Sequence, residues 1–112
     1  MEALKLSPSE KDALRQFKTR AESSLGGHLV KILLFGSKAR GDASEESDID
    51  LMVVLNDDDP ALEDLILDIA YEVNLAHEFY LSPKVITLKS LEDRTWRATP
   101  FIKAIEKESI EL

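Results

Sequence analysis

The sequence predicts a small α+β domain, in which a mixed β-sheet carries helices packed mainly on one face. Two long segments have apolar residues at helical spacing, and three shorter apolar runs are typical of strands. Polar, turn-forming stretches separate these segments. The expected order of elements is α-β-β-α-β-α. A chain of 112 residues can enclose one core, so we expect residues 1–112 to form a single domain.

The first helix is expected to begin after Ser7. Ser7 suits the N-cap and Pro8 the first helical position, while Glu10 can complete a capping box. The pair Gly26-Gly27 is expected to end this helix, because glycine adopts a left-handed conformation at little cost. Apolar residues recur at helical spacing along its buried face: Ala13, Leu14, Phe17, Ala21 and Leu25.

Two strands are expected next, over residues 29–35 and 48–55. The first is apolar on both faces, which suits a sheet covered by helices, and Lys31 is expected to mark an edge or a strand end. The second strand opens with Asp48 and Asp50. Because successive side chains on a strand alternate between faces, these two carboxylates are predicted to stand on the same face.

A second long helix is expected from Pro60, with Asp59 as its N-cap. The acids just before it, residues 57–59, are interpreted as solvated or capping groups rather than metal ligands. One stripe of apolar residues defines its buried face: Leu62, Leu65, Ile66, Ile69 and Val73.

The last part of the chain predicts a third strand over residues 79–88 and a final helix over residues 100–108. Pro83 lacks an N–H group, so the third strand should lie at a sheet edge or contain a bulge. A short helical segment is expected from Ser90. The final helix is expected to bury Phe101, Ile102 and Ile105.

The paired acids have a chemical meaning beyond the fold. Two adjacent carboxylates repel each other, and a divalent cation between them makes the arrangement favourable. Mg²⁺ accepts one or two carboxylates and completes its shell with water and phosphate oxygens. The phosphate side is expected at Gly36 and Ser37, where the backbone can approach a ligand closely and residues 38–40 begin a short helix. The pattern therefore predicts a magnesium–phosphate site.

This stretch resembles the signature of the nucleotidyltransferase superfamily, whose catalytic fold is like that of DNA polymerase β. The resemblance combines Gly36-Ser37, ten intervening residues and Asp48-x-Asp50, together with Arg40-Gly41 and Ser47. The short chain is similar to the minimal branch, the MNT antitoxins that accompany HEPN toxins. The closing helix over residues 100–108 also looks like that of the family.

The resemblance implies a Mg²⁺-dependent nucleotidyltransferase that moves an adenylyl group from ATP to a HEPN-type protein partner, as in a toxin–antitoxin pair. Asp48 and Asp50 would be its catalytic residues and its metal ligands. Arg40 could contact phosphate, or it could pair with Asp42 or a helix carboxylate. The residues that the resemblance implies for nucleotide and phosphate binding are Gly36, Ser37, Lys38 and Arg40.

One departure from the family pattern leaves two readings open. Fully active members carry a third carboxylate on the following strand, and the expected strand here contains none; Glu78, just before it, is the nearest acid. Either Glu78 completes the site, or the protein is a catalytically weak or inactive nucleotide-binding antitoxin that neutralises its partner by complex formation.

Composition narrows the classes of partner. The formal charge of −8 disfavours general nucleic-acid binding and suits a basic protein partner. The absence of cysteine excludes disulfides and thiolate metal sites. No bilayer-spanning apolar run or signal peptide is evident, so a cytoplasmic location is expected.

His28 and His77 are interpreted as surface or capping residues. An exposed Trp96–Phe101 patch would indicate a partner interface.

Overall fold

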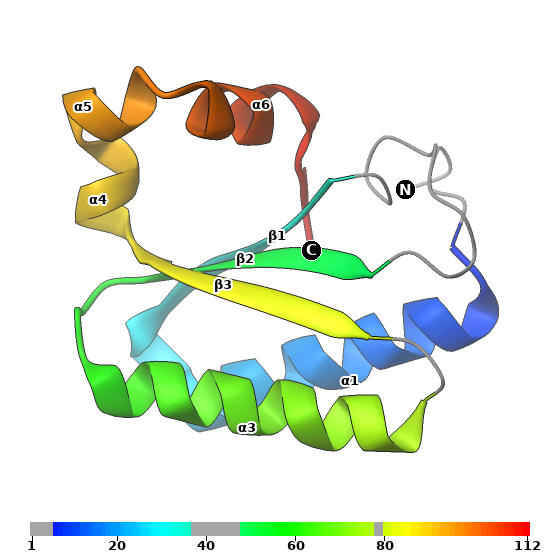
Figure 1. The fold of residues 1–112 in the computed structure, drawn as a ribbon. Helices are drawn as coiled ribbons and strands as arrows, with labels where there is room; N and C mark the ends of the chain where they lie inside the picture. The colour runs from blue at the N-terminus through cyan, green and yellow to red at the C-terminus, as the bar shows by residue number, and fades with distance from the viewer. Residues whose placement is uncertain (1–5, 37–47, 78–79) are drawn as a thin grey trace.

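A computed structural model describes residues 6–36, 48–77 and 80–112. The predicted α+β order is confirmed; the short helical segment expected from Ser90 is two short helices, and a short final strand is added (Figure 1). The elements are α1 (Pro8–Leu25), the 3₁₀ turn η1 (Gly26–His28), β1 (Leu29–Phe35), β2 (Ile49–Leu55), α3 (Pro60–Ala76), β3 (Leu81–Thr87), α4 (Leu88–Glu92), α5 (Arg94–Arg97), α6 (Pro100–Glu108) and β4 (Ile110–Glu111).

The strands form one mixed sheet in the order β3-β2-β1-β4. Strand β1 is antiparallel to β2 and β4, whereas β2 and β3 are parallel and joined through α3. Pro83 therefore lies on an edge strand, as expected from its missing N–H group. Lys31 was expected to mark an edge or a strand end. Strand β1 lies inside the sheet, and Lys31 lies near its start, at a register irregularity.

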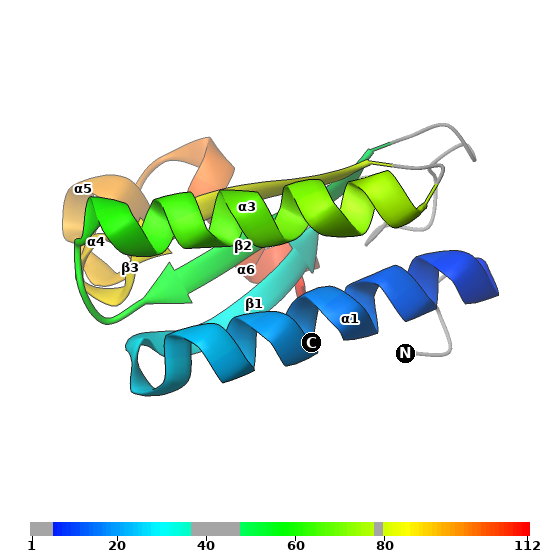
Figure 2. The same ribbon diagram turned by 90° about the horizontal axis from the view of Figure 1, so that it is seen from below.

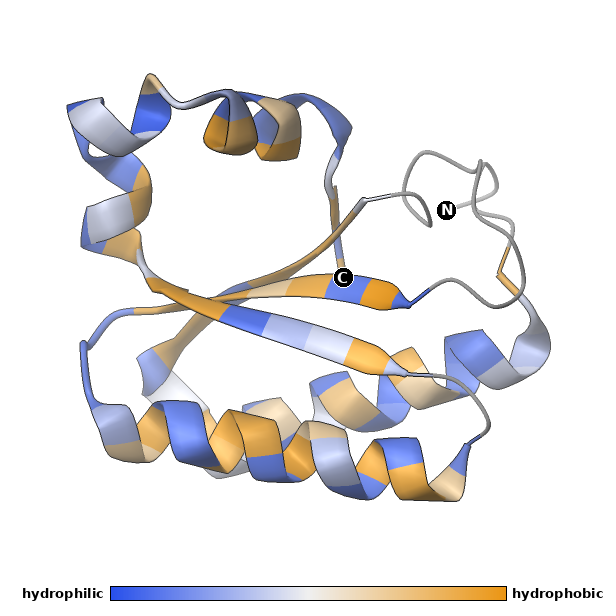
Figure 3. Cartoon of the chain, viewed as in Figure 1, coloured by the Kyte–Doolittle hydropathy of each residue, from blue (hydrophilic) through white to orange (hydrophobic). Residues whose placement is uncertain are grey.

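The two long helices, α1 and α3, cover one face of the sheet (Figure 2). The side chains buried between them and the strands are almost entirely apolar. In Figure 3, both long helices carry hydrophobic residues (orange) interspersed with hydrophilic ones (blue). The central part of this core is formed by Phe17, Leu34, Ile49, Leu51, Val53, Ile66, Val73 and Leu81.

The other face is covered by the short helices α4, α5 and α6, which lie above the sheet in Figure 1. Its smaller core contains Leu33, Met52, Val54, Ile86, Ile102 and Ile105. The prediction that Phe101 is buried is wrong, since 42% of it is exposed. Ile102 and Ile105 alone define the narrow buried stripe of α6, and the neighbouring position points about 100° away from it. Phe101 instead contacts the ring of Phe35 edge-to-face, with centroids 5.9 Å apart.

The helix ends follow the predicted capping chemistry. The Ser7 hydroxyl accepts a hydrogen bond from the Glu10 N–H at 3.1 Å, and the Glu10 carboxylate accepts one from the Ser7 N–H at 2.9 Å. Asp59 caps α3 by accepting from the Ala61 N–H at 2.9 Å. Each cap is worth about 0.5–2 kcal/mol. Among the helices described, none has the length and apolar character needed to cross a bilayer.

Candidate active site

The two acids lie at the start of β2, on the face of the sheet that α4–α6 cover. Asp50 is the second residue of the strand and is half-buried, and Asp48 precedes the strand and is exposed. Their neighbours Ile49 and Leu51 are fully buried in the core beneath α1 and α3. Because side chains alternate along a strand, both carboxylates are directed to the opposite face.

Gly36 brings the end of β1 against one of these acids. In the antiparallel register Phe35 pairs with Asp50, so Gly36 follows beside the carboxylate. Its φ of 76° favours glycine, and a Cβ placed on it would come within 3.3 Å of Asp50 Cγ and into contact with a carboxylate oxygen. The position therefore requires glycine for its backbone conformation and for its closeness to Asp50.

The other expected phosphate-binding residues, Ser37, Lys38 and Arg40, lie outside the described residues, as does Glu78. Within the described ranges, the site thus consists of the acid pair and the Gly36 corner. Both come from strand ends that the register of β1 and β2 brings together.

Strand β3 places two further polar residues on the face of Asp50, one of them directly beside it. Ser82 pairs with Asp50 in the parallel register, and Lys84 pairs with Met52. Sequence reasoning missed both residues. The alternation of Leu81, which is buried, with Ser82 indicates the shared face, but the match between β2 and β3 appears only in the structure. Strand β3 itself, LSPKVIT, contains no acid.

The donor set fits a magnesium ion. Asp50 lies on β2 and Asp48 directly before it, and Mg²⁺ is held in proteins by one or two carboxylates with water and phosphate oxygens. Among residues 6–36, 48–77 and 80–112, no three His, Asp or Glu side chains converge as a metal-binding group. A self-sufficient protein cage of the kind that binds Ca²⁺ is therefore absent from this described part of the chain.

A family comparison matches residues 14–112 to a model described as "Nucleotidyltransferase domain". The chain belongs to this nucleotidyltransferase family. A curated protein of Methanocaldococcus jannaschii, named "Putative protein adenylyltransferase", is 31% identical over 103 residues, covering 90% of this chain and 96% of the relative. A second protein of that name and organism is 33% identical over 87 residues, covering 70% of this chain and 58% of the relative.

Solved structures support the same fold for this nucleotidyltransferase. A spectinomycin adenyltransferase from Enterococcus faecialis, crystallised with ATP and spectinomycin, superposes with a TM-score of 0.62 at 15% identity, covering 73% of this chain and 36% of that one. A structure titled "putative minimal nucleotidyltransferase" has a TM-score of 0.53 at 24% identity, covering 90% and 94%. The chain is therefore a nucleotidyltransferase with a polymerase β-like fold.

The start of β3 in the nucleotidyltransferase is held between α3 and β2. The side-chain amide of Asn74 accepts a hydrogen bond from the Leu81 N–H at 2.7 Å and donates one to the Leu81 carbonyl at 3.2 Å. On the other side, the Ile49 N–H donates to the Tyr80 carbonyl at 2.9 Å. Asn74 thus satisfies the backbone groups that the edge of β3 would otherwise leave unpaired, and it positions the residues beside the acids.

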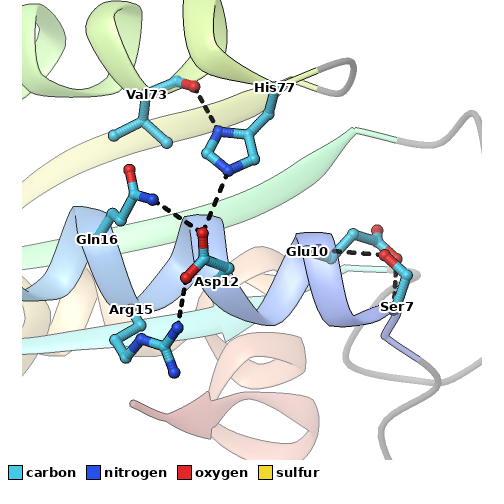
Figure 4. A network of polar contacts seen from close by, with 7 residues as sticks. All are labelled: Ser7, Glu10, Asp12, Arg15, Gln16, Val73 and His77. Carbon is cyan, nitrogen blue, oxygen red and sulfur yellow. Dashed lines mark hydrogen bonds and ion pairs between the residues drawn. The ribbon is translucent and has the colours of Figure 1, made fainter.

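A polar network joins α1 to the end of α3 below this region (Figure 4). His77 donates through Nδ1 to the Val73 carbonyl at 2.9 Å, and its Nε2 lies 3.7 Å from the Asp12 carboxylate. Asp12 also accepts hydrogen bonds from Arg15 and Gln16. The hydrogen bond from Arg15 is the main reason that the pKa of Asp12 lies below its usual range. His77 is a C-cap residue of α3, as expected.

A hollow of about 240 Å³ lies at the other end of β2, beyond Met52. Trp96 and Phe101 line it and are 44% and 42% exposed, which meets the condition stated above for a partner interface. The acids of residues 57–59 form part of its lining. Asp59 caps α3, which agrees with the capping interpretation of this acidic run.

Proposed function

We propose that this nucleotidyltransferase moves an adenylyl group from ATP to a protein partner, with Mg²⁺ held by Asp48 and Asp50. The observation that carries the proposal is the packing of Gly36 against the Asp50 carboxylate, at the meeting point of β1 and β2. The name of the Methanocaldococcus jannaschii relative supports the choice of donor and acceptor class.

The chemistry assigns a role to each residue. Nucleotidyl transfer needs an acceptor oxygen to attack the α-phosphorus while pyrophosphate leaves in line, and the protein contributes mainly positioning and charge neutralisation. Asp48 and Asp50 would hold the magnesium ion, which supplies neutralisation of the phosphate oxygens. The phosphates would be bound through backbone N–H groups and side chains of residues that follow β1 in the sequence: Gly36, Ser37, Lys38 and Arg40.

The acceptor in this proposal is a HEPN-type protein, and the nucleotidyltransferase acts as the antitoxin of the pair in the cytoplasm. The formal charge of −8 supports a partner with a basic surface, because opposite fields speed and orient the encounter. Neutralisation of the partner would then follow from its modification.

One observation favours a second candidate function. The residue of β3 that pairs with Asp50 is Ser82, where an acid would supply a further metal ligand. A nucleotide-binding antitoxin that neutralises its partner by occupation would need no third carboxylate. Under this reading, ATP binds but transfer is slow or does not occur.

The deciding experiment incubates the protein with ATP labelled at the α-phosphate, Mg²⁺ and the product of the neighbouring gene. Transfer of label to that protein, reduced at least about a hundredfold by Asp48→Asn or Asp50→Asn, supports the transferase. Asp64→Asn is the matched control, because it removes the same charge from an exposed position on α3, which covers the opposite face of the sheet.

The same samples distinguish the second candidate. A tight complex that the Asp48 and Asp50 substitutions leave intact, without label transfer from the wild type, supports neutralisation by binding. Absence of ATP binding, transfer and complex formation together would contradict both functions.

A further inference from the structure

The chain contains two tyrosines, and both are exposed, Tyr71 to 64% and Tyr80 to 57%. They lie in different surroundings. Tyr71 is on α3, the helix that packs under the face of the sheet opposite the acids. Tyr80 is the residue directly before β3, next to the strand that carries Asp48 and Asp50. Only one of the two tyrosines is therefore near the acid pair.

The ladder between β2 and β3 fixes the position of Tyr80. Ile49 pairs with Leu81, and the Ile49 N–H donates to the Tyr80 carbonyl at 2.9 Å. The ladder begins at this pair; continued one residue back, it places Tyr80 beside Asp48, each directly before its strand. Neighbouring strands lie about 4.8 Å apart, so these two residues are close neighbours.

Alternation then decides the side of the sheet. Leu81 is fully buried beneath α1 and α3, so the preceding residue is directed to the other face, as Asp48 is relative to Ile49. Asn74 holds Leu81 through both its N–H and its carbonyl, which limits movement of this strand end. Alternation therefore assigns the Tyr80 phenol to the face of the acid pair, one strand away from it.

We propose that the Tyr80 hydroxyl is an acceptor for the adenylyl group that this nucleotidyltransferase takes from ATP, so that the chain modifies itself. The inference rests on the proposed function. In the step, the Tyr80 phenol oxygen bonds to the α-phosphorus of ATP, and the bond from that phosphorus to the bridging oxygen of the β-phosphate breaks. Pyrophosphate leaves, the phenol proton goes to water, and Tyr80 carries AMP through a phosphodiester.

The exposed Tyr80 ring could instead stack on the adenine base of ATP. One substitution separates this stacking role from the proposed role of the hydroxyl as acceptor. Tyr80→Phe keeps the ring and removes only the hydroxyl, so it abolishes self-modification if the hydroxyl is the acceptor. Tyr71→Phe makes the same change at an equally exposed tyrosine away from the acids, and it serves as the matched control.

The test incubates the full chain with Mg²⁺ and ATP, without partner protein, and measures intact mass followed by peptide mapping. We expect one AMP per chain on the peptide that contains Tyr80, absent in Tyr80→Phe and in Asp50→Asn and retained in Tyr71→Phe. Label from the α-phosphate is incorporated and label from the γ-phosphate is not. The rate per molecule is independent of protein concentration, because acceptor and acids are in one chain.

Several results would overturn the inference. These are AMP on a different residue, unchanged modification of Tyr80→Phe, a rate that rises with protein concentration, or transfer to the partner protein with none to the chain. The last result leaves the proposed function standing. If neither the partner nor the chain is labelled and no pyrophosphate is released, the proposed function fails and this inference fails with it.

Discussion

The carboxylate of Asp50 occupies the space into which a side chain on Gly36 would extend. Two residues that are far apart in the sequence are thereby brought into direct contact by the antiparallel register of β1 and β2. The contact ties the backbone conformation of Gly36 to the position of an acid that we propose as a metal ligand.

The first prediction concerns this contact. Gly36→Ala should destabilise the protein by about 1–3 kcal/mol, because it adds a Cβ at positive φ and against a carboxylate. The rate of adenylyl transfer should fall by more than the loss of folded protein accounts for, because the added Cβ displaces the Asp50 carboxylate. Urea denaturation and α-phosphate label transfer measure the two effects. Gly27→Ala is the control, because a Cβ there meets no atom within 4 Å, and it should be nearly neutral.

A second prediction concerns the clamp on β3. Replacement of Asn74 by leucine leaves the Leu81 N–H and carbonyl without their side-chain partners, which should cost about 1–3 kcal/mol of unfolding free energy. Asn56→Ala removes one exposed hydrogen bond, to the Gly27 carbonyl, and should cost less. Equal effects in urea denaturation would contradict the assignment of a clamp to Asn74.

The third prediction compares two neighbours on α6. Ile102→Ala should cost about 2–5 kcal/mol, because it opens a cavity in the smaller core. Phe101→Ala should cost about 1 kcal/mol, since the ring is exposed and loses mainly its edge contact with Phe35. Chemical denaturation of both variants tests the order, and a larger loss at Phe101 would mean that its ring is covered in solution.

The fourth prediction concerns acid pH. Because its pKa is lowered in the folded protein, the Asp12 carboxylate contributes stability that is present at neutral pH. This contribution is lost as the pH falls through the folded-state pKa. Arg15→Gln removes the largest cause and should move the pKa of Asp12 back toward its ordinary value, as followed by NMR titration of the carboxyl carbon. Arg94→Gln, on α5, should leave that pKa unchanged.

Local sequence patterns were sufficient for the long elements. Ser7 with Glu10 and Asp59 with Pro60 mark the two long helix starts, because capping depends on residues only a few positions apart. The burial of Ile49 and Leu51 follows the alternation from which we predict that Asp48 and Asp50 share a face. These features need no knowledge of the rest of the chain.

The remaining features depend on distant contacts. Strand β4 has two residues and exists through its pairing with β1, so it leaves no periodic signal. The pairing of Asp50 with Ser82 is a parallel register across α3, and no turn residue specifies such a register. Phe101 was predicted to be buried because apolar side chains favour the core, but its direction on α6 depends on which neighbours the sheet already covers.

The unequal covering of the two sheet faces has a consequence for motion. One face is sealed by two long helices, whereas the cover over the face of Asp48 and Asp50 consists of short helices over a smaller buried cluster. Local opening requires less free energy where fewer apolar contacts are lost. The amides of α4–α6 should therefore exchange with deuterium earlier than those of α1 and α3, so the face that carries Asp50 can open locally while the larger core stays folded.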